Sequence, residues 1–138
     1  MKIMSNEITL SIIKPDAVER DLAENIKNIF IKNNLKIKDS KKIHITKDEA
    51  AEFYKVHQSK PFYNDLCAYL SSGPIVVMIL EGDSAVMLNR KLMGATNPKD
   101  AEENTIRKLY GISIDKNSVH GSDSIDNAKK EIEFFFNN

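Results

Sequence analysis

The 138-residue chain lacks both disulfide partners and long apolar runs. Its only cysteine is Cys67, which excludes an internal disulfide and a metal site of several thiolates. The apolar neighbours Leu66 and Ala68 predict that this thiol is buried. The longest apolar run, Ile75–Leu80, is far shorter than the roughly 20 residues of a membrane-spanning helix. Residues 1–7 lack the apolar core of a secretory signal, so we expect a cytoplasmic protein without a membrane span.

The chain also has no excess of charge of either sign. Lys and Arg together number 20, as do Asp and Glu, so the formal net charge at pH 7 is zero. A general nucleic-acid-binding protein presents a basic surface, and this balance does not provide one. The composition therefore argues against nucleic acid as the main partner, while a local basic site for a small anion stays open.

Hydrophobic periodicity predicts four strands within one domain, residues 1–138. No repeat, low-complexity tract or linker divides the chain. Alternation of apolar and polar residues predicts the first strand, and a continuous apolar run predicts a buried central one. The predicted strands cover Glu7–Ile13, Leu35–Lys38 with Ile43–Ile45, Ile75–Leu80 and a short segment at His120. A turn is expected at Glu81–Asp83.

Helical patterns lie between these strands. A capping box at Thr46–Glu49 opens one helix, Asn33-Asn34 ends another, and Gly94 stops a third. The predicted helices follow Pro15 (apolar Leu22, Ile26, Ile29 and Phe30), follow Thr46, surround Leu66–Leu70, cover Ala85–Met93 and end the chain (apolar Ile125, Ala128, Ile132 and Phe135). The residues 94–116 have little periodicity and are expected to form a long loop.

This order predicts an α/β (α+β) fold. Four strands separated by helices favour a ferredoxin-like antiparallel sheet, βαββαβ, with helices on one face. Added helices and the long loop before the last strand complete the expected architecture.

His120 is the strongest candidate for chemistry among the three histidines. Gly121 after it permits a sharp turn, and Ser122–Ser124 offer N-cap side chains for the final helix. An imidazole at this place would be exposed and close to the positive end of a helix dipole. Because most histidines are surface or satisfied core residues, His44 and His57 are interpreted in that way.

Cationic side chains stand at the ends of predicted elements. Lys14 ends the first strand, Arg90 precedes the long loop and Arg107 lies within it. The planar guanidinium matches phosphate oxygens, yet no glycine-rich P-loop pattern is present. These residues predict a phosphate-handling site of another design.

Several collinear segments resemble the nucleoside diphosphate kinase family, from Ile8 to Phe136. The most specific is His-Gly-Ser-Asp-Ser at 120–124, preceded by Asn117. The other matching segments are 12–18, Phe53-Tyr54, 60–62, 72–74, 92–98 and 105–107. The resemblance implies reversible transfer of a γ-phosphate from a nucleoside triphosphate to a nucleoside diphosphate by a ping-pong mechanism. The intermediate would be a phosphohistidine on the pros nitrogen of His120.

The resemblance also implies the roles of the residues near the nucleophile. Glu131 would bind the imidazole and fix its tautomer, Ser122 would support Glu131, and Tyr54 would lie beside the ring. Lys14 would hold the ribose hydroxyls with its partner Asn117 and add positive charge at the site.

The nucleotide-binding residues follow from the same resemblance. Arg90, Thr96 and Arg107 would bind the β and γ phosphates. The base would lie against three side chains: Phe62 stacked on it, Leu66 next to Phe62, and Ile114 opposite. Stacking without hydrogen bonds to the base edge predicts broad base specificity. Mg²⁺ would arrive on the nucleotide phosphates without a protein metal cluster, and a homo-oligomer, tetramer or hexamer, is implied.

The chain departs from the family pattern at a few positions. Glu103-Asn104 replaces Pro-Gly, and Lys108–Tyr110 replaces Gly-Asp-Phe, which puts the rigidity and subunit packing of the long loop in doubt. Asp21 and Glu24 replace glycines in the first helical region, where we expect the replacements to be harmless. Asn34 replaces a capping glycine.

Besides nucleic-acid binding, two other functions compete with the kinase interpretation. A catalytically inactive nucleotide-binding protein would lack one of His120, Arg90, Arg107 or Lys14, and all four are present. A histidine-dependent phosphatase would need an acid placed to activate water, and the sequence shows none.

Overall fold

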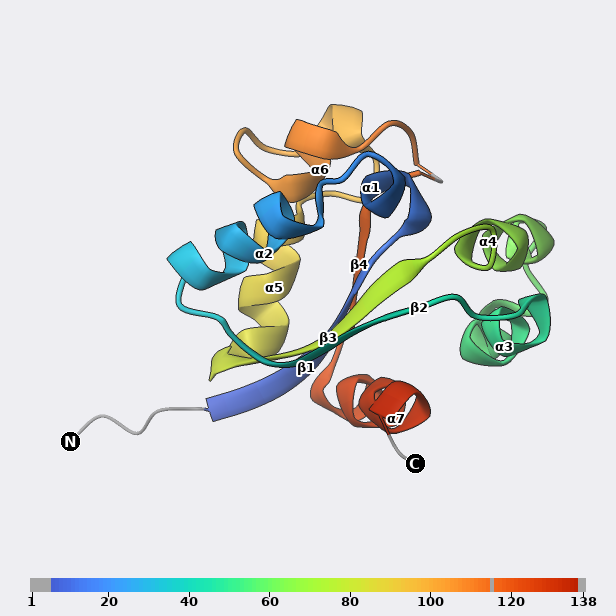
Figure 1. Cartoon of the computed structure of the whole chain (residues 1–138), viewed down its shortest axis with the longest axis horizontal. Coiled ribbons are helices and arrows are strands. Elements are labelled where there is room, and N and C mark those ends of the chain that lie inside the picture. Colours follow the sequence, from blue (N-terminus) through green and yellow to red (C-terminus); the bar gives the residue numbers. More distant parts are fainter. Residues whose placement is uncertain (1–5, 115, 137–138) are drawn as a thin grey trace.

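The computed structural model describes residues 6–114 and 116–136. Four strands form one antiparallel sheet (Figure 1) with the order β2-β3-β1-β4. They are β1 (Asn6–Ile13), β2 (Lys36–Ile43), β3 (Ile75–Asp83) and β4 (Val119–Gly121). The predicted ferredoxin-like sheet is thus confirmed. Residues 1–5, part of the segment tested for a secretory signal, lie outside the described residues.

Helices and 3-10 turns connect the strands. The α-helices are α1 (Pro15–Glu19), α2 (Ala23–Lys32), α3 (Lys47–Phe53), α4 (Tyr63–Leu70), α5 (Ala85–Met93), α6 (Ile106–Tyr110) and α7 (Ile125–Phe136), and the 3-10 turns are η1 (Lys55–His57) and η2 (Pro98–Asp100). The capping box is confirmed, because Thr46 Oγ1 accepts from the Glu49 amide at 3.1 Å while Glu49 Oε1 accepts from the Thr46 amide at 2.9 Å. None of the described helices is long and apolar enough to cross a membrane.

Helices cover both faces of the sheet (Figure 1): the helices α2 and α5 lie together on one face, as expected for a ferredoxin-like core, and added helices cover the other. On one face α2 and α5 pack against side chains such as Met78 and Leu80. On the other, α3, α4 and α7 pack against side chains such as Leu10 and Val77, and Cys67 is buried there as predicted. The polar side chains of Thr9 and Ser11 on β1 are not exposed to solvent, because α5 packs over this face of the strand.

Two strands differ from their predicted bounds. The strand β3 continues through Asp83, so the predicted turn at 81–83 was wrong; these residues pair with β1 from Asn6 to Ile8. The strand β2 is continuous across its polar middle, with a register shift between Ile37 and Asp39, and ends before His44. Pairing with a neighbouring strand thus outweighs the local turn and polar signals.

Left-handed backbone at non-glycine residues explains several departures from the family pattern. Asp21 has φ 60° in the turn between α1 and α2, so the expectation of one continuous helix there was wrong. Asn34 has φ 70°, which confirms the left-handed cap after α2. Asn104, at a family glycine, has φ 68°. Asn and Asp tolerate this conformation better than other residues with a Cβ, so the turns survive without glycine.

We expect Asn104→Ala to lower the free energy of unfolding by about 1 kcal/mol, because a Cβ without a local hydrogen-bonding group disfavours positive φ. Asn104→Gly should match or exceed the wild type, since glycine adopts this conformation freely. Urea denaturation of the three proteins measures the difference. Equal stability of the alanine and glycine variants would contradict the explanation.

Candidate functional site

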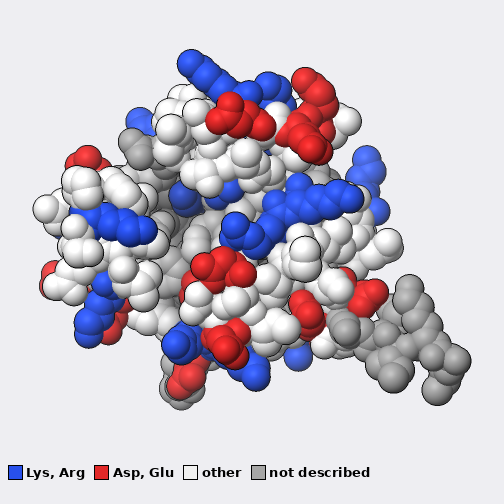
Figure 2. Space-filling model, turned by 180° about the vertical axis from the view of Figure 1, so that it is seen from behind, with Lys and Arg blue, Asp and Glu red and all other residues white. Residues whose placement is uncertain are grey.

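A cavity of ≈ 820 Å³ opens between η1, α4, β4, α7 and the loop segments around 96 and 114. Figure 2 shows the hollow from behind, with Lys and Arg side chains inside it. Of the site residues predicted from the sequence, these line the cavity: Tyr54, Phe62, Leu66, Arg90, Thr96, Arg107, Ile114, Asn117, His120 and Glu131. The remaining two, Lys14 and Ser122, bind lining residues. The structure therefore brings the whole predicted set together.

His120 lies on β4 opposite Ile12 of β1, and its ring is fixed by a carboxylate. Its Nε2 is 2.9 Å from Glu131 Oε1, and Ser122 Oγ donates to the same oxygen at 2.8 Å. Among the described residues, Nδ1 has no hydrogen-bond partner. A carboxylate at Nε2 favours the tautomer that carries its proton there, which leaves the Nδ1 lone pair free.

An aromatic side chain also restrains this imidazole. The ring of Phe53 meets that of His120 edge-on, with centroids 5.2 Å apart and planes at 77°. Tyr54, next in sequence, lines the same cavity. Burial raises the pKa of Tyr54 well above its usual value, so the phenol stays protonated and can donate a hydrogen bond at neutral pH.

Gly121 serves a different purpose from the sharp turn expected from the sequence. It lies within β4, and its φ is not in the left-handed region. An added Cβ would overlap the amide of Asn89 and approach the Met93 sulfur to 2.5 Å. Glycine is needed because α5 passes directly over β4. The predicted N-cap after it is confirmed at Ser124, whose Oγ accepts from the Asn127 amide at 3.1 Å.

Two arginines carry positive charge into the cavity. Arg107 is buried, and its terminal nitrogens donate to the carbonyls of Gly94 at 3.0 Å and Val119 at 2.9 Å. Burial, and secondly the charge of Arg90, lower the pKa of Arg107 to about 10. The guanidinium remains charged at neutral pH. Two cations facing one cavity favour an anionic ligand.

Lys14 and Asn117 form a buried polar pair beside the cavity. Lys14 Nζ donates to Asn117 Oδ1 at 2.9 Å, and both residues are more than nine-tenths buried. The Asn117 amide in turn donates to the carbonyls of Ile114 at 2.9 Å and Thr96 at 3.3 Å. The pair therefore joins the end of β1 to two segments of the long loop.

Apolar side chains lie where the cavity meets solvent. Phe62 is 43% exposed and Ile114 is 55% exposed, and Leu66 lies with them along the lining. Large apolar side chains left open beside a polar pocket are typical of a site for a flat, partly apolar ligand.

Sequence reasoning missed His57, which it treated as a surface or satisfied histidine. The structure places His57 in the cavity lining, and its buried Nδ1 has no partner among the described residues. Burial, then the charge of Lys60, lower the pKa of His57, so the ring is neutral near pH 7. Its spacing of three residues from Tyr54 was the available signal, because η1 turns both side chains toward the same side.

Asp123 also lines the cavity and was not singled out from the sequence. A hydrogen bond from Asn127 and the charge of Arg90 lower its pKa, so this carboxyl is ionised at neutral pH. Among residues 6–114 and 116–136, no group of three or more His, Cys, Asp or Glu side chains is placed to hold a metal ion.

Comparison with known proteins decides the family. The sequence model described as "Nucleoside diphosphate kinase" matches residues 7–138. The chain belongs to the nucleoside diphosphate kinase family. A curated nucleoside diphosphate kinase from Nitratiruptor sp. is 56% identical over 94% of this chain and 95% of its own length, and one from Campylobacter jejuni is 55% identical over the same shares. The Aquifex aeolicus nucleoside diphosphate kinase structure superposes with a TM-score of 0.94 at 39% identity, covering 96% of each chain.

Membership of the nucleoside diphosphate kinase family confirms the resemblance seen in the sequence and makes the chain an enzyme. A second solved member, from Encephalitozoon cuniculi, has a TM-score of 0.92 at 37% identity and covers 96% of this chain. The matched part of the chain includes the residues that line the cavity. This cavity is therefore the site at which we look for the family's chemistry.

We expect Gly121→Ala to lower the free energy of unfolding by about 1–3 kcal/mol, the usual cost of overpacking. The new methyl group would displace α5, which carries Arg90. Gly73→Ala is the matched control, because its Cβ would meet only Pro15 Cβ at an ordinary 3.6 Å. Denaturant unfolding measures both variants. If they are equally stable, the close packing of α5 on β4 is not what requires glycine.

Proposed function

We propose that this kinase transfers the γ-phosphate of a nucleoside triphosphate to a nucleoside diphosphate by a ping-pong mechanism through a phosphohistidine at His120. The observation that carries the proposal is the fixed ring of His120, with Nε2 on Glu131 at 2.9 Å, in a cavity lined by Arg90 and Arg107. The free Nδ1 is the pros nitrogen, which makes it the acceptor of the phosphoryl group.

The transfer divides into two balanced steps. The Nδ1 lone pair of His120 attacks the γ-phosphorus, the bond from that phosphorus to the β–γ bridging oxygen breaks, and the electron pair leaves with the nucleoside diphosphate. A terminal β-phosphate oxygen of the second nucleotide then attacks the same phosphorus, and the electron pair of the P–N bond returns to Nδ1. The ring proton stays on Nε2, where the Glu131 carboxylate stabilises the positive charge gained by the imidazole.

The cations of the site would bind the phosphates. Arg90 and Arg107 supply fixed positive charge, and Thr96 supplies a hydroxyl in the same lining. Tyr54, protonated at neutral pH, would donate beside the transferring group. His57 also lines the cavity, and we include its imidazole among the nucleotide-binding groups.

The nucleoside would occupy the rest of the cavity. Lys14 and Asn117 would bind the ribose hydroxyls from their buried pair, and Phe62 would stack on the base with Leu66 and Ile114 nearby. Stacking reads the π-face that every base possesses, so broad specificity is expected.

Mg²⁺ would enter with the nucleotide. No described group of side chains could hold the ion alone, and the carboxylate of Asp123, ionised in the same cavity, is a group that could contact it. When bound, the cation would neutralise phosphate charge during transfer.

We propose a homo-oligomer, tetramer or hexamer, from the family. The exposed apolar residues Leu109 (50%) in α6 and Ile112 (57%) just after it offer surface for subunit contacts. The cytoplasmic location stays a prediction.

The test is incubation with ATP and Mg²⁺, intact-mass analysis, and then addition of a nucleoside diphosphate. The wild type should gain one acid-labile phosphate and lose it to the acceptor, whereas His120→Ala should gain none. His44→Gln is the matched control, since His44 Nε2 contacts the Ser71 carbonyl at 2.8 Å outside the cavity. A phosphorylated His120→Ala variant, or an unphosphorylated wild type, would refute the proposal.

A further inference from the structure

The backbone just before His120 is strained at one residue. Ser118 has φ 75°, and the amide of Val119 donates to the carbonyl of Asn117 at 2.9 Å. A hydrogen bond across a single residue with positive φ defines the rarer and less favourable form of the γ-turn. Serine has no intrinsic preference for this conformation, so neighbouring groups must hold it.

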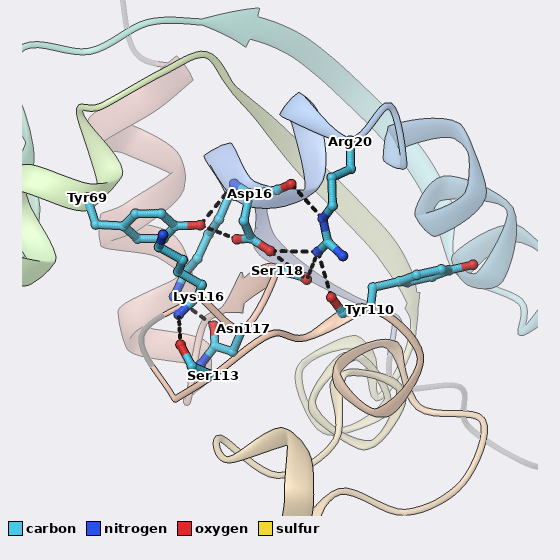
Figure 3. A network of polar contacts seen from close by, with 9 residues as sticks. Asp16, Arg20, Tyr69, Tyr110, Ser113, Lys116, Asn117 and Ser118 are labelled. Carbon is cyan, nitrogen blue, oxygen red and sulfur yellow. Dashed lines mark hydrogen bonds and ion pairs between the residues drawn. The ribbon is translucent and has the colours of Figure 1, made fainter.

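The side chain of Ser118 is tied to a buried carboxylate (Figure 3). Its hydroxyl donates to Asp16 Oδ2 at 2.9 Å, and Arg20 donates to the same oxygen at 3.0 Å. The Tyr69 hydroxyl donates to Asp16 Oδ1 and accepts from the Asp16 amide at 2.9 Å. Asp16 is only 5% exposed and Ser118 is fully buried. The carboxylate is therefore fixed by α1, α4 and the turn at once.

Residues on both sides of the turn belong to the proposed site. Asn117, which precedes Ser118, holds Lys14, and His120 follows two residues later. The strand that carries His120 has only three residues, and the backbone of Ser118 is joined to the end of β1 by one bond, from the Lys14 amide to the Ser118 carbonyl at 2.8 Å. Any relaxation at Ser118 would be passed to the ribose-binding pair on one side and to the nucleophile on the other.

We propose that Asp16 and Ser118 are positioning residues for phosphoryl transfer. Their hydrogen bond holds the γ-turn in its left-handed form and thereby sets the places of Asn117 and His120. This inference rests on the proposed function of His120. Neither residue is itself part of the cavity lining, so both act through the backbone.

The test compares Ser118→Ala with Ser118→Gly. Alanine removes the hydroxyl and keeps the strain of positive φ, whereas glycine removes both. We expect phosphoenzyme formation at saturating ATP to slow by about three- to tenfold in Ser118→Ala, the loss of one ordinary hydrogen bond. Ser118→Gly should recover most of this rate, because glycine adopts the turn without strain. Ser71→Ala is the control: its hydroxyl donates to the Cys67 carbonyl, and its removal should leave the rate unchanged.

Thermal unfolding of each variant separates folding from positioning. A merely structural role would lower the melting temperature and leave the rate of the folded enzyme unchanged, which would overturn the inference. It is also overturned if Ser118→Ala keeps the wild-type rate, or if Ser118→Gly is as slow as Ser118→Ala. These outcomes leave the phosphohistidine mechanism intact, whereas a wild type that forms no phosphoenzyme refutes that mechanism itself.

Discussion

The buried guanidinium of Arg107 joins the parts of the molecule that form the cavity. It donates to the carbonyl of Gly94, where α5 ends, and to that of Val119, next to His120. Burying a cation is costly, and no described carboxylate forms an ion pair with this one. The pKa falls only to about 10, so the positive charge persists. A bound polyphosphate would supply the counter-charge that the protein leaves out, and ligand binding and folding stability would thereby be linked.

The close contact between α5 and the sheet has a similar character. Thr9, Ser11 and Asn89 are fully buried at this interface, and their side chains include polar atoms without hydrogen-bond partners among the described residues. Such atoms cost free energy. The contact is kept by Gly121, which lets the helix approach β4. Because α5 packs closely on β4, Arg90, the residue after Asn89, reaches the cavity from α5 while His120 reaches it from β4.

Signals that act within a few residues were predictable from the sequence, and those that depend on distant neighbours were not. The capping box at Thr46 and the four strands follow from local pattern. The extension of β3 to Asp83 depends on pairing with β1 and contradicts a local turn signal. Within the site, the family motifs predicted the residues that the structure gathers around His120, apart from His57 and Asp123. They could not show the γ-turn at Ser118, whose positive φ is held by Asp16 from 102 positions away, nor the unpartnered nitrogen of His57.

The two ends of the cavity differ in how firmly their side chains are held, and this difference bears on specificity. At the polar end, Lys14, Asn117 and Arg107 are buried and fixed by hydrogen bonds to backbone or to one another. At the open end, Phe62 and Ile114 have large exposed fractions and present only apolar surface. A ligand's phosphates and ribose would meet groups that are already in place, so little ordering is needed there. Its base would meet surfaces that distinguish shape poorly and hydrogen-bonding edges not at all. If phosphoryl transfer occurs at His120 as proposed, geometry would be strict where the phosphoryl group is transferred and permissive where nucleotides differ, which is the arrangement that broad base specificity would require.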